Sequence, residues 1–304
     1  NIILRAGNPT RPDPAPVANP LRVLGWDIKK ACPGIPYEYR LGVQGGQYPY
    51  QFRLLTAPEG MQVDPALGTL TWLPQAASGQ VAVAMDITDQ AGQRITHSFA
   101  LHVSADAFRF VAADGDDSNP GTAEAPWATI EHAVKTADNS QFIYVREGSY
   151  PVHVYIENQD CGKLLAYPGD EVSLVGKGTD TGSIWLKGEG EYILQGFHCD
   201  ANKSRWFLCA DTPSLTGLTV RKNHMFNVAD EGLENPAFLF FWDGEQKPIQ
   251  GEKHYSDILV QENSFHSLRN PNHHGASATL YNVQDLVFED NLVYDIDGNG
   301  VTDK

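Results

Sequence analysis

The chain has 304 residues, of which 41% are apolar, so it is long enough for about two domains with substantial hydrophobic cores. It contains no run of about 18 apolar residues, so no transmembrane span is expected. The formal net charge of −16 disfavours nucleic acid and other polyanions as partners, unless a cation bridges them. An acidic, globular protein with cation sites fits these properties.

Residues 1–25 predict an extended, proline-rich segment. The stretch from Asn8 to Pro20 contains five prolines, and this density forbids helix and favours polyproline-like backbone. The short apolar run from Ile2 to Leu4 could form an edge strand. Because Asn1 is not an initiator Met, we expect either a processed protein that is secreted or extracellular at the cell surface, or a trimmed chain.

Residues 26–105 predict an antiparallel β-sandwich. Short alternating stretches, such as Tyr48–Leu54 and Thr96–Val103, follow one another with turns and no helical period between them. The order GGQYPYQFRLLTAPEGMQVDPALGTLTWLPQ, followed by ITDQAGQ, resembles the bacterial Ig-like and cadherin-like repeat family. This resemblance implies a spacer or adhesion module rather than a catalyst.

Three residues of this sandwich have alternative interpretations. Trp72 is expected to pack between two sheets, and the alternative is a platform for stacking sugar rings. Asp86 and Asp89 could bind calcium at an interdomain joint, as in cadherins, or could be turn-forming acids.

Residues 106–304 predict a right-handed parallel β-helix. Phe108 to Ala112 has the pattern of a strand, and a short amphipathic helix opened by Thr129 or its neighbours follows it. That helix is indicated by apolar residues at helical spacing: Ile130, Ala133, Val134 and Ala137. The stretch resembles the entry segment of pectate-lyase-like β-helix proteins, which implies that strand and helix cap the first turn. We expect the intervening loop DGDDSNPGT to form a hydrogen-bonded turn, with calcium binding as the alternative.

Three later stretches repeat one pattern: LTVRKNHMFN, ILVQENSFHS and LVFEDNLVYD. In each, alternating apolar residues lead into an asparagine, at positions Asn223, Asn263 and Asn291. Such recurrence predicts stacked rungs in which the asparagine side chains bond to one another along an internal ladder. The pattern specifies the architecture, but this architecture hosts lyases, hydrolases, epimerases and noncatalytic adhesins alike.

Aligning the repeats on their asparagines predicts two rows of outward side chains. The first row is Arg221, Gln261 and Glu289, and the second is Lys222, Glu262 and Asp290. Cleavage of a uronate polymer by β-elimination needs a cation and a base, for which Lys222 or Arg221 with His224 could serve. Hydrolysis would instead need two carboxylates, such as Glu262 with Asp290 or Glu289. The alternative is that these rows are merely solvated strand faces.

Further residues near these rows are candidates for substrate binding: Arg269, His266, His273, His274 and Trp242. His273 and His274 lie in an expected loop, which argues against core packing as their role. Two adjacent histidines on a strand cannot easily face one metal ion, so no zinc or copper site can be completed from the sequence.

A candidate calcium site lies in the last ten residues. Asp295, Asp297, Asn299 and Asp303 match the first part of an EF-hand or dockerin-like loop, in which alternating oxygen side chains converge on one Ca²⁺ ion. A solenoid corner bent at Gly298 and Gly300, with Val301 starting the next strand, explains the same residues without metal. Because no capping element follows, we expect a fragment, a nicked product, or an open end covered by another chain or a second copy.

Four cysteines, Cys32, Cys161, Cys199 and Cys209, form no CxxC pair and no zinc-like cluster with histidine. Cys199 and Cys209 could pair in an oxidising compartment or could remain buried thiols.

The sequence therefore leaves three functions open. The first is a secreted protein that acts on or binds a polysaccharide, with calcium-assisted lyase chemistry as implied by the pectate-lyase-like resemblance. The second is a noncatalytic adhesin or filament subunit that presents one β-helix face. The third is a glycoside hydrolase on the same coil.

Overall fold

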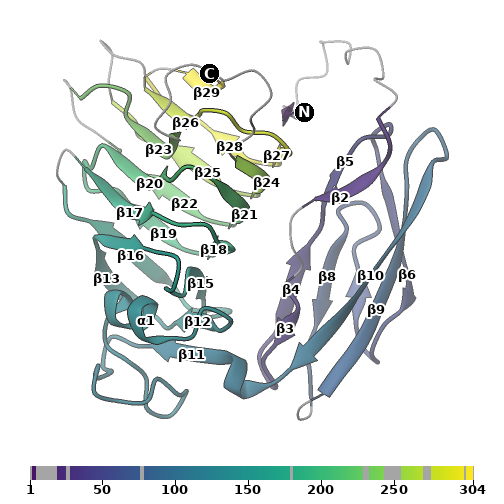
Figure 1. Ribbon diagram of the computed structural model, residues 1–304, viewed down its shortest axis with the longest axis horizontal. Coiled ribbons are helices and arrows are strands. Elements are labelled where there is room, and N and C mark those ends of the chain that lie inside the picture. The colour runs from purple at the N-terminus through teal and green to yellow at the C-terminus, as the bar shows by residue number, and fades with distance from the viewer. Residues whose placement is uncertain are drawn as a thin grey trace. The chain divides into compact units, whose positions relative to one another are not determined.

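The computed structural model describes residues 2–4, 19–24, 28–75, 79–178, 181–228, 233–242, 255–269, 275–297 and 299–303. The chain divides into two compact units, residues 3–108 and residues 109–304 with 1–2 (Figure 1). Among the described residues, strands dominate, and the helices are α1 (Ile130–Thr136) and the single 3-10 turn η1 (Ala105–Ala107). No helix in these ranges is long and apolar enough to cross a membrane.

The first unit is built from short, mostly antiparallel strands. One sheet has the order β3 (Lys30–Ala31), β10 (Arg94–Val103), β9 (Gly79–Thr88), β6 (Gln51–Thr56). A second has the order β4 (Tyr37–Arg40), β8 (Thr69–Trp72), β7 (Gln62–Val63), and β2 (Arg22–Leu24) pairs with β5 (Gly42–Gln44). Tyr39 meets Phe99 edge-to-face, with ring centroids 6.1 Å apart, so the first two sheets pack against each other.

In the first unit, the side chains of Trp72, Asp86 and Asp89 form hydrogen bonds with other groups of the protein. Trp72 is half-buried rather than part of the core, and its indole donates to the Glu59 carbonyl at 3.0 Å. Asp86 lies within β9, where it accepts hydrogen bonds from Arg94, Thr96 and Arg53. The bond from Arg94 is the main reason that the pKa of Asp86 is lowered. Asp89 accepts from two backbone amides at 2.7 Å, as a turn-forming acid does.

The second unit is a parallel β-helix with three faces (Figure 1). Face A contains β12 (Phe142–Val145), β15 (Lys163–Ala166), β18 (Tyr192–Gln195), β21 (Leu215–Arg221), β24 (Tyr255–Gln261) and β27 (Leu286–Glu289), with β11 (Phe108–Val111) beside β12 at one end of the strand order. A further short strand, β1 (Ile2–Leu4), lies near the N-terminus. Face B contains β13 (Gly148–Val152), β16 (Val172–Gly176), β19 (His198–Asp200), β22 (His224–Phe226), β25 (Ser264–His266) and β28 (Leu292–Val293). Face C contains β14 (Val154–Ile156), β17 (Gly182–Leu186), β20 (Trp206–Asp211), β23 (Ala237–Trp242), β26 (Ala276–Leu280) and β29 (Asn299–Asp303). Each rung adds one strand to every face, which confirms the predicted solenoid.

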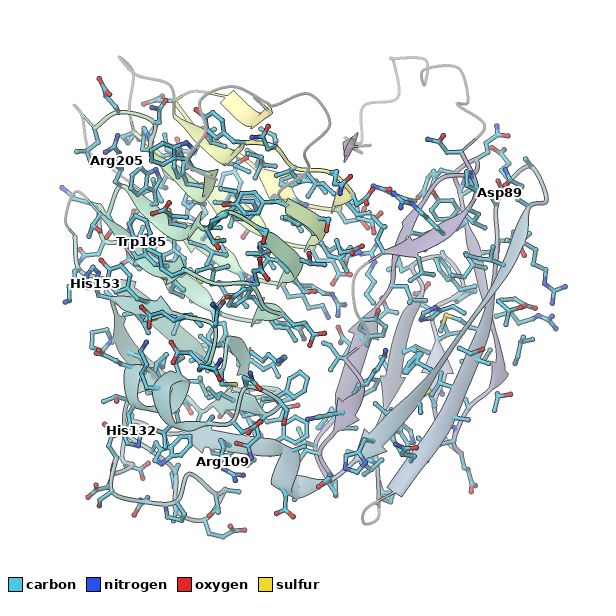
Figure 2. The ribbon with its side chains drawn as sticks, in the orientation of Figure 1. Asp89, Arg109, His132, His153, Trp185 and Arg205 are labelled. Carbon is cyan, nitrogen blue, oxygen red and sulfur yellow. The ribbon has the colours of Figure 1, made fainter. Side chains whose placement is uncertain are left out.

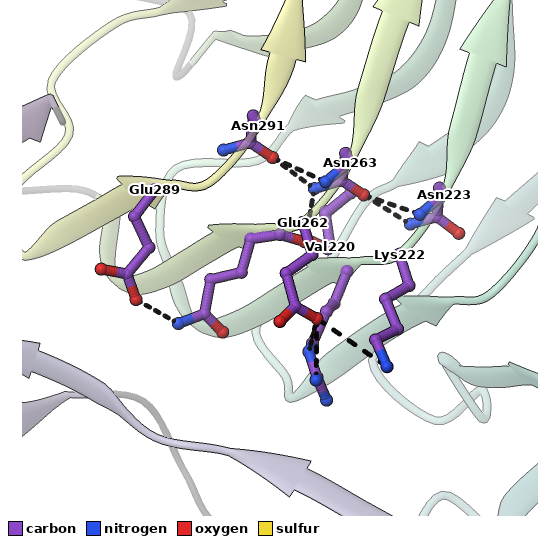
Figure 3. A network of polar contacts seen from close by, with 9 residues as sticks. Val220, Lys222, Asn223, Glu262, Asn263, Glu289 and Asn291 are labelled. Carbon is purple, nitrogen blue, oxygen red and sulfur yellow. Dashed lines mark hydrogen bonds and ion pairs between the residues drawn. The ribbon is translucent and has the colours of Figure 1, made fainter. Parts of the chain in front are cut away.

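The predicted asparagine ladder is present (Figure 3). The side-chain oxygen of Asn263 accepts from the backbone N–H and the amide of Asn223, at 3.0 and 3.1 Å. The oxygen of Asn291 accepts in the same way from Asn263, at 2.9 Å for both bonds. Each side-chain amide also donates to a carbonyl one rung earlier: Asn223 to Leu194, Asn263 to Val220, and Asn291 to Val260. The ladder thus gives the backbone N–H groups of Asn223 and Asn263 an acceptor at the corner between faces A and B.

The residue before each asparagine explains why the corner is sharp. Lys222, Glu262 and Asp290 have φ of 54°, 58° and 55°, so each lies in the left-handed region. A non-glycine residue there is uncommon and costs free energy, which the ladder bonds that follow can offset.

Helix α1 packs against β12, β13 and β14, the first face A, B and C strands after β11. Ile130, Ala133 and Val134 are buried in the same core cluster as the interior of the solenoid. The helix starts where predicted, because the Thr129 hydroxyl accepts from the His132 N–H at 3.2 Å.

The acidic loop before α1 is a hydrogen-bonded turn, as the sequence favoured. Asp116 accepts from the Ser118 N–H and hydroxyl. Asp117 accepts from the N–H groups of Ala128 and Thr129, both at 2.9 Å, and from the Thr129 hydroxyl at 2.7 Å. Asp117 therefore fixes the entry to the helix.

We expect Asp117→Asn to destabilise the protein by about 1 kcal/mol at pH 7, because charge-assisted bonds at the helix start are weakened. Partial burial raises the pKa of Asp117, but the bonds from Thr129 and Ala128 outweigh it and keep the pKa below its usual value. A lowered folded-state pKa stabilises the fold above the unfolded-state value, and this contribution is lost as pH falls through the folded-state value. Urea denaturation measures the free energy of unfolding of wild type and of Asp117→Asn. The difference between the two should therefore be smaller at pH 3 than at pH 7. Glu124→Gln, which changes an exposed acid in the same loop, is the control and should leave the free energy of unfolding unchanged. If the effect of Asp117→Asn is the same at both pH values, the charge of Asp117 does not stabilise the start of the helix.

All four cysteines are free and buried. Cys199 belongs to the interior core cluster, whereas Cys209 packs with Ala237 and Phe240 in a separate cluster. The disulfide that the spacing allowed is therefore absent, and burial raises the pKa of both thiols.

Candidate functional site

Side chains of the predicted first row lie in register on face A. Gln195, Arg221, Gln261 and Glu289 stand opposite one another in consecutive strands. The Arg221 guanidinium binds the carboxylate of Glu262, with Nε and Nη2 at 3.0 and 2.8 Å from Oε2. Gln261 donates to Glu289 at 2.8 Å, and the Lys222 ammonium lies 3.9 Å from Glu262 (Figure 3).

This first row is buried rather than solvated. Arg221 is 1% exposed, Gln261 0% and Glu289 6%. A buried Arg is stable only when it is paired, and Glu262 supplies the opposite charge. The guanidinium of Arg221 is thus already neutralised by the protein, while Asp290 is exposed at the corner.

His224 and His266, predicted as base and substrate-binding residue, meet on the outer side of face B. Their Nε2 atoms are 2.6 Å apart and their ring centroids 4.7 Å apart. His266 is stacked between Phe226 and Tyr294, at centroid distances of 5.5 and 4.8 Å. Burial is the largest cause that lowers the pKa of each histidine, and the neighbouring His266 lowers that of His224 further.

Of the four residues predicted to bind calcium, the structure describes the side chains of Asp295 and Asp297, and both lie near Arg269. Asp295 forms an ion pair with Arg269 at 2.7 Å, and Asp297 lies 3.9 Å from the same guanidinium. Residues 299–303 form β29, which pairs with β26, so the backbone follows the corner-and-strand interpretation. Within the described part of the chain, no group of three or more His, Cys, Asp or Glu residues could hold a metal ion. The side chains of Asn299 and Asp303, and all of His273 and His274, lie outside the described residues.

Sequence reasoning missed a column of aromatic side chains on the outer side of face C. This aromatic column consists of Tyr155, Trp185, Trp206, Phe240 and Tyr281. Successive ring centroids are 5.8, 5.8, 4.6 and 6.2 Å apart. Figure 2 shows Trp185 between His153 and Arg205 along this side of the solenoid. The column therefore runs across consecutive rungs.

The indole N–H groups of the aromatic column are already bonded to backbone. Trp185 donates to Gly182 at 3.2 Å, and Trp206 donates to Asn235 at 2.9 Å. Their polar atoms are satisfied, and the indole rings remain partly exposed. Tyr155 is 40% exposed and Phe240 only 7%, so the column presents apolar surface to solvent at Tyr155 and at the partly exposed rings of Trp185, Trp206 and Tyr281.

Cationic and anionic groups flank the aromatic column. Lys187 lies 4.7 Å from the Trp185 ring centroid, and Arg205 lies 4.4 Å from that of Trp206. Lys187 also forms an ion pair with Asp211. The predicted substrate-binding residue Trp242 ends β23 of the same face and is 37% exposed. Face C thus combines aromatic rings with a small number of charged groups.

The aromatic column had a weak signal in the sequence. VHVYI, SIWL and AFLFFW each carry an aromatic residue between apolar ones, and Trp206 follows Arg205 at the start of a further apolar stretch, RWFLCA. Tyr155, Trp185 and Phe240 occupy one register row, with Cys209 between them. Aligning these strands would have placed the rings together.

No protein-family model matches the chain, and no curated protein matches it. Among solved structures, the chain is similar to a family 28 exopolygalacturonase of Yersinia enterocolitica, with 9% identity over 93% of this chain and 64% of that chain, and a TM-score of 0.44. It is also similar to a rhamnogalacturonan lyase, with 14% identity over 64% of this chain and 62% of that chain, and a TM-score of 0.27. The chain spans less than two thirds of the length of either structure. Because both TM-scores are below 0.5, neither likeness contributes to the conclusions below.

Proposed function

We propose that this protein is a secreted, carbohydrate-active β-helix that binds a polysaccharide along the aromatic column of face C. The column itself is the observation that carries the proposal. Sugar rings have apolar faces that can pack on aromatic side chains, and partly exposed apolar patches in soluble proteins mark ligand-binding surfaces. With parallel strands about 4.8 Å apart, five rungs extend over roughly 19 Å, enough for a short oligosaccharide.

The charged groups beside the column would orient the polymer. Lys187, Asp211 and Arg205 are hydrogen-bonding groups beside aromatic rings, which is the usual composition of a specific ligand site. Sugar hydroxyl groups can both donate and accept, so they can bond to either member of the Lys187–Asp211 pair. The net charge of −16 opposes an acidic polymer, unless calcium bridges it. Calcium accordingly stays part of the proposal, with Asp295, Asp297, Asn299 and Asp303 as its candidate ligands.

Whether the bound polymer is cleaved is a separate step of the proposal. Calcium-assisted β-elimination, as the pectate-lyase-like resemblance implies, would use Lys222 or Arg221 with His224 as base. Hydrolysis would use Glu262 and Asp290. The ion pair of Arg221 with Glu262 favours a noncatalytic binding protein over a lyase, because a neutralised guanidinium is poorly placed to attract a substrate carboxylate.

The first unit would then serve as a spacer or a second carbohydrate-binding module. Its antiparallel sheets are compatible with the Ig-like and cadherin-like resemblance, and we propose that assignment on the sequence motifs together with the packed sheets.

The test is a panel of neutral and acidic polysaccharides, each with added calcium and with chelator. Binding is measured by affinity electrophoresis, and products by the absorbance of unsaturated sugars and by release of reducing ends. We expect retardation by at least one polymer. Unsaturated product would identify a lyase, reducing ends alone a hydrolase, and binding without product a noncatalytic protein. Absence of binding to every polymer would refute the proposed function, and equal binding with calcium and with chelator would remove calcium from it.

A further inference from the structure

The outer side of face B brings together three histidines from consecutive rungs. His198 and His224 stand opposite each other in β19 and β22, with ring centroids 5.4 Å apart. His266 comes from β25, one rung further, and its Nε2 is 2.6 Å from the Nε2 of His224. The Nε2 atoms of His224 and His266 therefore face each other, and the His198 ring lies edge-on beside that of His224.

A hydrogen-bonded chain sets the orientation of the His266 ring. Its Nδ1 is 2.8 Å from the Ser267 hydroxyl, which lies 3.4 Å from the carboxylate of Asp295. Asp295 is in turn held by Arg269 at 2.7 Å. Because a carboxylate only accepts, Ser267 donates to Asp295 and accepts from His266, which assigns the proton to Nδ1 and the lone pair to Nε2. Stacking between Phe226 and Tyr294 holds the ring in this position.

This arrangement is that of a metal ligand with its supporting group. A ligating histidine commonly donates its other ring N–H to an oxygen, which fixes the tautomer and raises the basicity of the ligating nitrogen. Imidazole nitrogen is a preferred ligand of zinc and copper, and it is a poor ligand for calcium. Bond lengths of about 2.0–2.1 Å to Zn²⁺ would need the two Nε2 atoms to separate to roughly 3.3 Å, a small rotation of partly exposed rings.

We propose that His224 and His266 bind one divalent transition-metal ion through their Nε2 atoms, with water or an external ligand in its other positions. This two-histidine site differs in its ligands, which are nitrogen atoms, from the Asp295–Asp303 calcium candidate, whose ligands would be oxygen atoms; the two have Asp295 in common. It is also independent of the aromatic column, which lies on face C. Asp295 acts here through Ser267 and is a positioning residue.

The test is titration of the untagged protein with Zn²⁺ in a calorimeter, together with electron paramagnetic resonance of the Cu²⁺ form. We expect one ion per chain at this site and a copper spectrum with coupling to two imidazole nitrogens. His224→Gln and His266→Gln should each weaken Zn²⁺ binding at least about tenfold, and Ser267→Ala should weaken it by about tenfold through loss of orientation. His132→Gln, a histidine on α1, should leave the affinity unchanged.

Two results would overturn the metal site. One is a Zn²⁺ affinity that neither His224→Gln nor His266→Gln changes, because the ion would then be bound by other histidines of the chain. The other is a wild-type copper spectrum without coupling to two imidazole nitrogens, and this readout holds even if a variant fails to fold. Circular dichroism of each variant separates loss of a ligand from loss of the solenoid.

Discussion

Replacing Asn263 by alanine is expected to lower the free energy of unfolding of the β-helix by about 3–5 kcal/mol. The side chain of Asn263 accepts two bonds from Asn223 and donates to Val220, Gln261 and Asn291. Alanine would leave the buried Asn223 N–H without its acceptor, at roughly 1–3 kcal/mol, and would remove the side-chain bonds to Val220 and Asn291, at roughly 1 kcal/mol each. Urea denaturation followed by tryptophan fluorescence measures the change.

Two variants make this experiment specific to the ladder. Asn263→Asp keeps the acceptor oxygen but cannot donate to Val220, so it should still destabilise strongly at neutral pH, where it also buries a charge. Asn139→Ala removes an exposed asparagine side chain in the turn before β12, and it should change the free energy of unfolding by less than about 0.5 kcal/mol. If Asn263→Ala is no worse than Asn139→Ala, the ladder does not stabilise the coil.

Trp185→Ala removes one ring of the aromatic column and is expected to weaken polysaccharide binding by about 10- to 30-fold, equivalent to roughly 1.4–2 kcal/mol. The column continues through Tyr155 and Trp206 on either side, so Tyr155→Ala should cause a smaller loss of the same kind. Dissociation constants for the polymer selected by the panel measure both effects.

The matched control for the column is a partly exposed aromatic ring elsewhere. Tyr167 follows β15 of face A, is partly exposed and has the Arg146 guanidinium 4.2 Å from its ring centroid, so Tyr167→Ala should bind the polymer like wild type. Thermal unfolding of Trp185→Ala checks that its solenoid is intact, because aromatic columns also stabilise parallel sheets through stacking. Equal affinities for Trp185→Ala and wild type would place the polymer on another surface.

The ladder could be predicted from sequence because its residues recur in a fixed local pattern. Each asparagine follows an alternating strand and a left-handed corner residue, so Asn223, Asn263 and Asn291 align without knowledge of the loops between them. The register row of Arg221, Gln261 and Glu289 followed from the same alignment. Its burial could not be predicted, because the alternation shows which side of a strand a residue occupies but not what covers that side.

The aromatic column and the histidine pair lacked such a pattern. The five rings are separated by 30, 21, 34 and 41 residues, because loops of different length join the rungs, so no constant period marks them. His224 and His266 lie 42 residues apart and occupy neighbouring rows of face B, so an alignment by position alone does not bring them into contact. Both groups emerge only when the strand pairing is known.

A crystal structure of the protein with a bound oligosaccharide from the selected polymer tests the central claim most directly. The account predicts sugar rings packed on Trp185 and Trp206 of face C, with hydroxyl or carboxylate groups bonded to Lys187 or Asp211. Sugar bound over Arg221 and Glu262, or on the first unit alone, would contradict it.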